Sequence, residues 1–168
     1  MPEILLDLGD KKNYKGESNI TDFDDLIICE SFGFSAHQPL DLGRGTNRSA
    51  GAMSVSEIQI SRQFDSSSTK LLAAMFTGKN FAEVKIHFLK AGDEEKKAFS
   101  EFLTVELSDA MFSGISYSGS SGGSMLAESI SIGYTAINYV YKTQNPDTGK
   151  HDAGQVTASF DMLKMEGK

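Results

Sequence analysis

Strict alternation of apolar and polar residues is the feature that most constrains the fold of this chain. In EVKIHFLK, residues 83–90, the apolar Val84, Ile86 and Phe88 alternate with Glu, Lys and His. A period of two places successive side chains on opposite faces of a β-strand. We therefore predict a strand here, with Val84, Ile86 and Phe88 facing the core and His87 in solvent.

Related patterns recur along most of the chain. The ranges that we predict as strands are 3–9, 24–35, 55–64, 83–90, 98–109, 110–118, 128–142 and 155–163. About eight strands at short spacing favour a barrel or a two-sheet sandwich. With 168 residues and 39% hydrophobic residues, we predict one domain spanning 1–168, mainly β, with a flexible tail at 164–168.

The predicted strand 24–35 carries bulky side chains at one parity and mostly small or polar ones at the other. The bulky set, which we expect to be buried, is Leu26, Ile28, Phe32 and Phe34. The other set includes Ile27, Cys29, Ser31 and Ser35. A strand lining a water-filled space has this pattern, but an ordinary solvent-facing strand has it more often. Cys29 is the one cysteine, so we interpret it as a small apolar residue without a disulfide.

One stretch, residues 63–79, has a helical pattern instead. Its apolar residues Leu71, Leu72, Met75 and Phe76 recur at spacings of three and four. We expect one of Ser66, Ser67 and Ser68 to cap the start, because a short hydroxyl accepts from the free N–H groups of the first turn. Gly78 is expected to end the helix. Leu72, Met75 and Phe76 are expected to anchor it against the core.

Residues 36–54 have no clear period, and they contain one proline and two arginines. We predict a long extended loop here. Loops of this length are uncommon in compact domains, and they are often functional.

Several classes of function are disfavoured by composition and motifs. The net charge of −7 argues against nucleic-acid binding, because phosphates require a basic surface. No apolar run approaches the roughly 20 residues of a membrane-spanning helix, and no N-terminal signal peptide is visible, so we expect cytoplasmic synthesis and no membrane insertion. The three histidines lack metal-ligand spacing, and no nucleophile elbow occurs. We therefore expect no enzyme activity, cofactor or metal.

The order of several segments resembles the haemolysin co-regulated protein (Hcp) family, the tube-forming proteins of bacterial type VI secretion systems. The matching segments are KGES (15–18), SFGF (31–34), the loop 36–54, the helical region 63–92, FLTVELSDAMFSGISYSGSSGG (102–123) and ESISIGYTAINYVYKTQNPDTG (128–149). Each motif is weak alone, and their shared order and spacing carry the resemblance.

The resemblance implies a compact β-barrel with one short helix on its side, assembling into a homohexameric ring. Rings would stack into a hollow tube inside a contractile sheath, with a spike protein at the tip and effector proteins in the lumen. The tube would be secreted without an N-terminal signal. We expect Leu40, Leu42, Arg44 and Arg48 of the loop to contact the next ring, and Ser31 and Ser35 to line the lumen.

A variant within the family, such as a cargo adaptor that forms rings but does not stack, would differ in loop 36–54. Two alternatives outside the family also remain open at this stage. The first is a small-molecule-binding β-barrel, which should be monomeric and contain an apolar cavity. The second is a hydrolase whose site is assembled from residues distant in sequence, with clustered titratable groups in a cleft.

Overall fold

The computed structural model describes residues 3–41, 49–94, 97–144 and 151–168. The described elements are β1 (Glu3–Asp7), β2 (Ile27–Cys29), β3 (Ser31–Gly33), β4 (Ala36–His37), β5 (Leu40–Asp41), β6 (Ser49–Ala50), β7 (Ser54–Val55), β8 (Ile58–Gln63), α1 (Ser68–Phe76), β9 (Phe81–Glu94), β10 (Lys97–Ser118), β11 (Ala127–Gly133), β12 (Ala136–Gln144), β13 (His151–Asp161) and β14 (Glu166–Gly167). The predicted class, mainly β with one helix, is confirmed.

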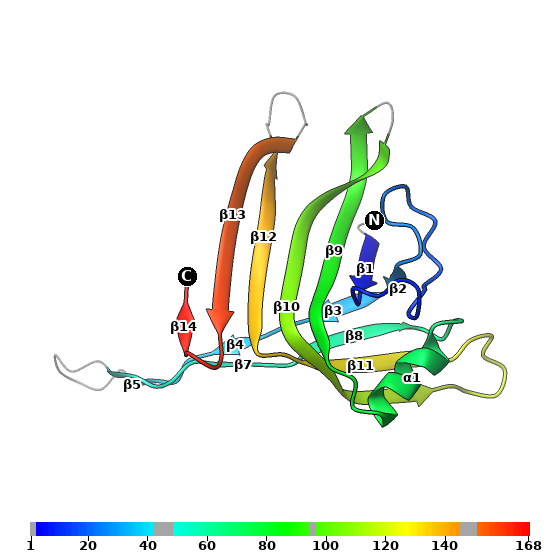
Figure 1. Ribbon diagram of the computed structural model, residues 1–168, viewed down its shortest axis with the longest axis horizontal. Coiled ribbons are helices and arrows are strands. Elements are labelled where there is room, and N and C mark those ends of the chain that lie inside the picture. The colour runs from blue at the N-terminus through cyan, green and yellow to red at the C-terminus, as the bar shows by residue number, and fades with distance from the viewer. Residues whose placement is uncertain (1–2, 42–48, 95–96, 145–150) are drawn as a thin grey trace.

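Two antiparallel sheets share the long strand β10 (Figure 1). Sheet A has the order β2-β1-β9-β10-β12-β13-β14, and sheet B has the order β10-β11-β8-β3. Residues 103–108 of β10 pair with both β9 and β12, whereas residues 111–118 pair with β11. In Figure 1 the strands of sheet A run vertically and those of sheet B run horizontally.

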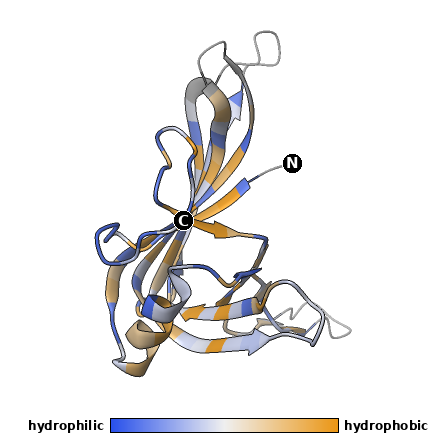
Figure 2. Ribbon diagram, turned by 90° about the vertical axis from the view of Figure 1, so that its right-hand side faces the viewer, coloured by the Kyte–Doolittle hydropathy of each residue, from blue (hydrophilic) through white to orange (hydrophobic). Residues whose placement is uncertain are grey.

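The main core lies where the two sheets and α1 face one another. Its most deeply buried side chains, each at most 2% exposed, include Ile58, Ile60, Ile130 and Ile132 of sheet B, Val84, Ile86, Val105 and Leu107 of sheet A, and Leu71 of α1. Figure 2 shows the alternation of hydrophobic and hydrophilic residues along the strands that supplies these side chains. The predicted inward positions Val84 and Ile86 are thus confirmed.

A second, smaller cluster packs on the other face of sheet A. It consists of Leu5, Leu26 and Leu89, and Ile20, Phe23 and Phe99 pack against it. The segment between β1 and β2 therefore covers part of this face and is anchored there by Ile20, Phe23 and Leu26.

The burial predicted for residues 24–35 is confirmed for Leu26, which is 2% exposed, but it is wrong for Ile28 and for the two residues beside it. Ile27 and Cys29 are 1% and 5% exposed, whereas Ile28 is 41% exposed. The reason is that β2 pairs with β1 in sheet A, Glu30 interrupts the strand, and β3 pairs with β8 in sheet B. One inserted residue reverses which parity faces the core. Cys29 is confirmed as a buried, free thiol.

Two further strand boundaries differ from the prediction. Ranges 98–109 and 110–118 form one continuous strand, β10, which passes from sheet A to sheet B near Asp109, a residue with φ of 47°. Conversely, the predicted strand 128–142 divides into β11 and β12. The chain turns at Thr135, whose N–H donates to the carbonyl oxygen of Ser108 at 3.0 Å. Both corners move the chain between the sheets.

The helix is confirmed within 63–79, but part of its predicted core contact is wrong. Leu71 and Ala74 are buried at 0% and 4% exposure, and Phe76 is 79% exposed. Leu72 and Met75 are partly buried. The buried side of the helix is centred one residue earlier than predicted. Apolar residues at spacings of three and four occur on two adjacent sides of this helix, so the spacing alone does not show which side faces the core.

The helix ends differ in how well they follow the expected chemistry. Ser67 stands at the N-cap, but its hydroxyl caps no helical N–H and instead donates to Asp65 Oδ1 at 2.5 Å. At the other end, Gly78 has φ of 63°. The N–H groups of Gly78 and Lys79 donate to the carbonyl oxygens of Met75 and Ala74, at 3.2 and 2.9 Å. Gly78 therefore closes the helix as predicted.

The predicted loop 36–54 contains a narrow two-stranded ribbon, which we call the arm. Strand β4 pairs with β7, and β5 pairs with β6. Figure 1 shows the arm extending away from both sheets at the left-hand end of the molecule. Residues 164–168, predicted as a flexible tail, contain β14, which pairs with Phe160 and Asp161 of β13. Backbone pairing with an existing edge holds this segment.

Candidate assembly surfaces

The outward face of sheet B is a ladder of small polar residues. Ser31, Ser61, Ser129 and Ser116 lie directly opposite one another on β3, β8, β11 and β10. The hydroxyl oxygens of Ser31 and Ser61 are 2.5 Å apart. We call this line of four residues the serine row. It forms because serine alternates with core-facing isoleucines on β8 and β11.

The neighbouring rows of the same face are also uncharged. One contains Gly33, Gln59, Ser131 and Gly114, and the other contains Gln63, Ala127 and Ser118. The Ser131 hydroxyl donates to Gln59 Oε1 at 2.8 Å. No position in these rows carries a charge or an aromatic ring, although Gln63 Nε2 donates to the exposed carboxylate of Glu30 at 2.7 Å. The face therefore offers mainly hydrogen-bonding groups.

Sheet B has two open edges among the described residues. β3 pairs with β8 alone, and residues 111–118 of β10 pair with β11 alone. Each edge therefore presents backbone N–H and C=O groups to which another strand can pair. The two edges lie on opposite sides of one small sheet.

The base of the arm is fixed to sheet B. Ser35 N–H donates to Ser56 Oγ at 2.9 Å, and Ser56 N–H donates to the carbonyl oxygen of Ser35 at 2.8 Å. The Tyr134 hydroxyl donates to the carbonyl oxygen of Ser56 at 2.7 Å, and burial raises the pKa of Tyr134 to about 12. These contacts set the direction in which the arm leaves the sheet.

The predicted contact residues are placed only in part. Ser31 belongs to the serine row, and Ser35 is exposed at the base of the arm. Leu40 lies on the arm and is 62% exposed. Leu42, Arg44 and Arg48 lie outside the described residues. The predicted lumen residue Ser31 and the predicted stacking residue Leu40 therefore lie on different parts of the molecule, Ser31 on sheet B and Leu40 on the arm.

A buried charged cluster lies behind the serine row, and sequence reasoning missed it. Arg62 and Glu128 have side chains that are 0% exposed, with Arg62 Nε 3.4 Å from Glu128 Oε2. Arg62 also pairs with Asp65 and donates from Nη1 to Ser67 Oγ at 2.9 Å. Ser68 donates to Glu128 Oε2 at 3.1 Å, so the cluster connects α1 to sheet B.

The alternation of residues along β8 and β11 could have predicted this cluster. Arg62 follows Ile58 and Ile60 at the same parity, and Glu128 precedes Ile130 at the inward parity of β11. A charge at an inward position predicts a buried partner of opposite charge.

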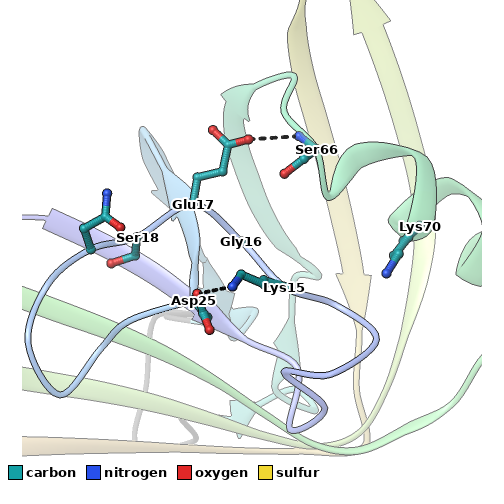
Figure 3. Close-up of a pocket in the computed structure, with 8 residues that line it drawn as sticks. Lys15, Gly16, Glu17, Ser18, Asp25, Ser66 and Lys70 are labelled. Atoms are coloured by element: carbon teal, nitrogen blue, oxygen red, sulfur yellow. Dashed lines mark hydrogen bonds and ion pairs between the residues drawn. The ribbon is translucent and has the colours of Figure 1, made fainter.

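The KGES segment lines a pocket of about 520 Å³ beside the start of α1 (Figure 3). Its charges are already paired, since Lys15 contacts Asp25 at 3.0 Å and Glu17 Oε1 accepts from the N–H of Ser66 at 3.3 Å. A Cβ on Gly16 would lie 2.2 Å from the carbonyl oxygen of Leu26. The segment therefore acts as a structural connection that requires glycine at its closest approach.

The prediction that His87 lies in solvent is wrong. Its side chain is 13% exposed, Nδ1 is 2.5 Å from Glu101 Oε1, and the ring packs edge-on against Phe23. The covering segment between β1 and β2 explains this burial. Burial opposes ionisation of Glu101, but hydrogen bonds from His87, Lys142 and Thr104 outweigh it and lower the pKa of Glu101 to about 2.

The described residues contain neither a metal-binding cluster nor a membrane-spanning helix. Residues 3–41, 49–94, 97–144 and 151–168 contain no group of three or more His, Cys, Asp or Glu side chains arranged to hold a metal ion. The same part of the chain contains no helix long and apolar enough to span a membrane.

Comparison with known sequences identifies relatives. The family model described as "Type VI secretion system effector, Hcp" matches residues 6–141. Protein hcp1 of Pseudomonas aeruginosa strain PAO1 is 28% identical over 104 residues, which is 62% of this chain and 62% of that protein. The match therefore spans less than two thirds of that relative.

Solved structures share the fold over nearly the whole chain. A type six secretion system protein superposes with a TM-score of 0.86 at 22% identity, covering 100% of both chains. Hcp1 from Salmonella typhimurium has a TM-score of 0.75 at 20% identity, covering 99% of both chains. The secreted protein Hcp3 from Pseudomonas aeruginosa has a TM-score of 0.58 at 17% identity, covering 95% of this chain and 96% of that one.

Proposed function

This chain belongs to the Hcp family of type VI secretion system proteins, and from that membership we propose that it is a structural tube protein. Six copies form a closed ring, and rings stack into a hollow tube that is secreted. In this role the chain needs surfaces for self-assembly and no catalytic residues, cofactor or metal.

The observation that carries this proposal is the pair of open edges on sheet B. β3 of one copy and residues 111–118 of β10 in the next copy offer complementary backbone groups. A head-to-tail contact of this kind closes into a ring when the rotation per copy divides a full turn. Closure pairs both edges and removes sites that would otherwise recruit further strands.

In such a ring, sheet B of each copy contributes to one continuous inner wall, and the serine row faces the lumen. Ser31 lies in this row, and Ser35 continues its parity at the base of the arm. A wall made mostly of hydroxyl and amide groups accommodates effector proteins of different surface charge. The outer surface then meets the sheath, and a spike protein meets the end of the tube.

The mass of the purified protein in solution tests the ring. The monomer is 18.2 kDa, and light scattering after size exclusion should give about six times that mass. Electron micrographs should show rings with a central hole. A monomer at every concentration measured would contradict the proposal.

Labelling of single cysteines tests which face lines the lumen. The native Cys29 should not react with maleimide, because its thiol is buried and burial raises its pKa to about 12. In assembled tubes, Ser129→Cys should react with a small maleimide but not with a bulky polymer maleimide, whereas Val156→Cys on β13 should react with both. Equal reaction of Ser129→Cys with both reagents would place the serine row outside the lumen.

A further inference from the structure

An exposed apolar cluster lies at the end of the molecule opposite the arm. It consists of Phe64, Tyr117, Met125 and Leu126, and we call it the end patch. Tyr117, Met125 and Leu126 are 37%, 57% and 44% exposed. In Figure 1 the connection between β10 and β11, which carries Met125 and Leu126, lies at the right-hand end, and the arm lies at the left-hand end.

The end patch is held in place by local contacts. The rings of Phe64 and Tyr117 meet edge to face, with centroids 5.4 Å apart. The N–H of Phe64 donates to the carbonyl oxygen of Leu126 at 2.9 Å. A Cβ on Gly119 would lie 2.4 Å from Leu126 Cδ2, so this leucine rests directly on the loop backbone. The patch is therefore formed before any partner arrives.

The segment that carries Tyr117, Met125 and Leu126 of the end patch is also uncharged. The chain has a net charge of −7, yet no charged residue occurs from Ala110 to Ala127. Exposed apolar side chains scattered singly need no explanation, but a group of them at one end of the molecule indicates a contact surface. The carboxylates nearest in sequence to the patch, Asp65 and Glu128, are both paired with Arg62, which favours an apolar partner over a charged one.

The arm carries an exposed apolar side chain that could pack against such a patch. Residues 35–41 are all exposed, and an isolated two-stranded ribbon is only marginally stable in water. Pro39 packs against Gly51, where a Cβ would lie 3.1 Å from Pro39 Cγ, and Leu40 points outward at 62% exposure. The arm thus presents an apolar side chain that the described residues of its own copy leave mostly uncovered.

We propose that the end patch of one copy receives the arm of a second copy in the next ring, with Leu40 packed against Met125 and Leu126. This inference rests on the proposed stacking of rings. Copies that stack head to tail use two different surfaces at opposite ends of the stacking direction. The arm and the end patch lie at opposite ends of the long axis of the molecule.

Disulfide trapping tests this contact. The double variant Leu40→Cys/Met125→Cys, mildly oxidised as assembled rings, should give a ladder of covalent multimers on a non-reducing gel. The control Leu40→Cys/Val156→Cys carries a second cysteine at a position as exposed as Leu40, but on β13. It should give no ladder, and Cys29 is too deeply buried to contribute.

A charge substitution gives a second readout. Met125→Asp should keep the six-fold mass and lose stacking into tubes, because an unpaired carboxylate would be buried against Leu40. Met125→Leu, which conserves volume, should keep both.

The outcomes separate the two proposals. If the unmodified protein is monomeric, the ring itself is wrong, and this inference is lost with it. If rings form but the Leu40→Cys/Met125→Cys variant gives no more multimers than its control, the ring stands and the end patch is not the receiving surface.

Discussion

At the scale of single residues, the most consequential side chain is Arg62, which sits with Glu128 inside the protein. The Nε and Nη2 atoms of Arg62 and Oε1 of Glu128 have no partner in hydrogen-bonding geometry, although the charges are paired. A buried ion pair contributes little net stability, but removing one member leaves an uncompensated charge.

We therefore expect Arg62→Met to lower the free energy of unfolding by about 3–5 kcal/mol. The double variant Arg62→Met/Glu128→Met should recover much of this loss, because it removes the fully buried one of the two carboxylates that lose Arg62 as a partner. Urea denaturation measures both. A loss below about 1 kcal/mol in the single variant would mean that water or neighbouring groups already compensate the charge.

Glu101 makes stability depend on acid pH. Its folded-state pKa is about 2, below the usual value of 4.5, so the carboxylate stabilises the fold above pH 4.5. That contribution is lost as the pH falls from about 4.5 towards 2, because the unfolded chain binds the proton first. The difference in unfolding free energy between the native protein and Glu101→Gln should therefore shrink over this window. A difference that is constant with pH would contradict the assignment.

At the scale of elements, α1 contains apolar residues that share helical spacing but differ in burial. Leu71→Ala should lower the free energy of unfolding by about 2–5 kcal/mol, because Leu71 is fully buried in the core. Phe76→Ala, on the exposed side, should change it by no more than about 0.5 kcal/mol. Thermal or urea unfolding compares them, and equal losses would show that Phe76 anchors the helix after all.

The strand elements show a similar limit of local patterns. Alternation correctly located most strands, but it could not distinguish the continuous β10 from two strands, or the pair β11 and β12 from one. The corners at Asp109 and Thr135 depend on hydrogen bonds between residues far apart in sequence, such as Thr135 to Ser108. The periodicity of a segment carries no information about hydrogen bonds to distant segments.

At the scale of the whole molecule, the proposed role of the arm in stacking rings into a tube can be tested directly. Leu40→Asp/Leu42→Asp should leave the six-fold mass unchanged and abolish tubes in electron micrographs, since two carboxylates cannot be buried between rings. Leu42 lies outside the described residues, and its inclusion follows the sequence prediction. Leu40→Met/Leu42→Met should form tubes normally. Tubes in the Asp variant would show that stacking does not use this part of the arm.

Local sequence information was sufficient for the β class, the position of the single helix and its end at Gly78. It was also sufficient, through the order of motifs, for the family. These features depend on period, turn chemistry and segment order, which are readable along the chain. The residues of the candidate surfaces are a different matter: Ser31 was identified as one of a set of alternating small residues, without its three partners.

Only the tertiary structure brought Ser31, Ser61, Ser129 and Ser116 into one row, buried His87 under Phe23, and reversed the parity of residues 24–35 at Glu30. It also placed the arm and the end patch at opposite ends of the molecule (Figure 1). The physical reason is common to all four. Register, coverage and direction are set by contacts between segments distant in sequence, and no single segment contains that information.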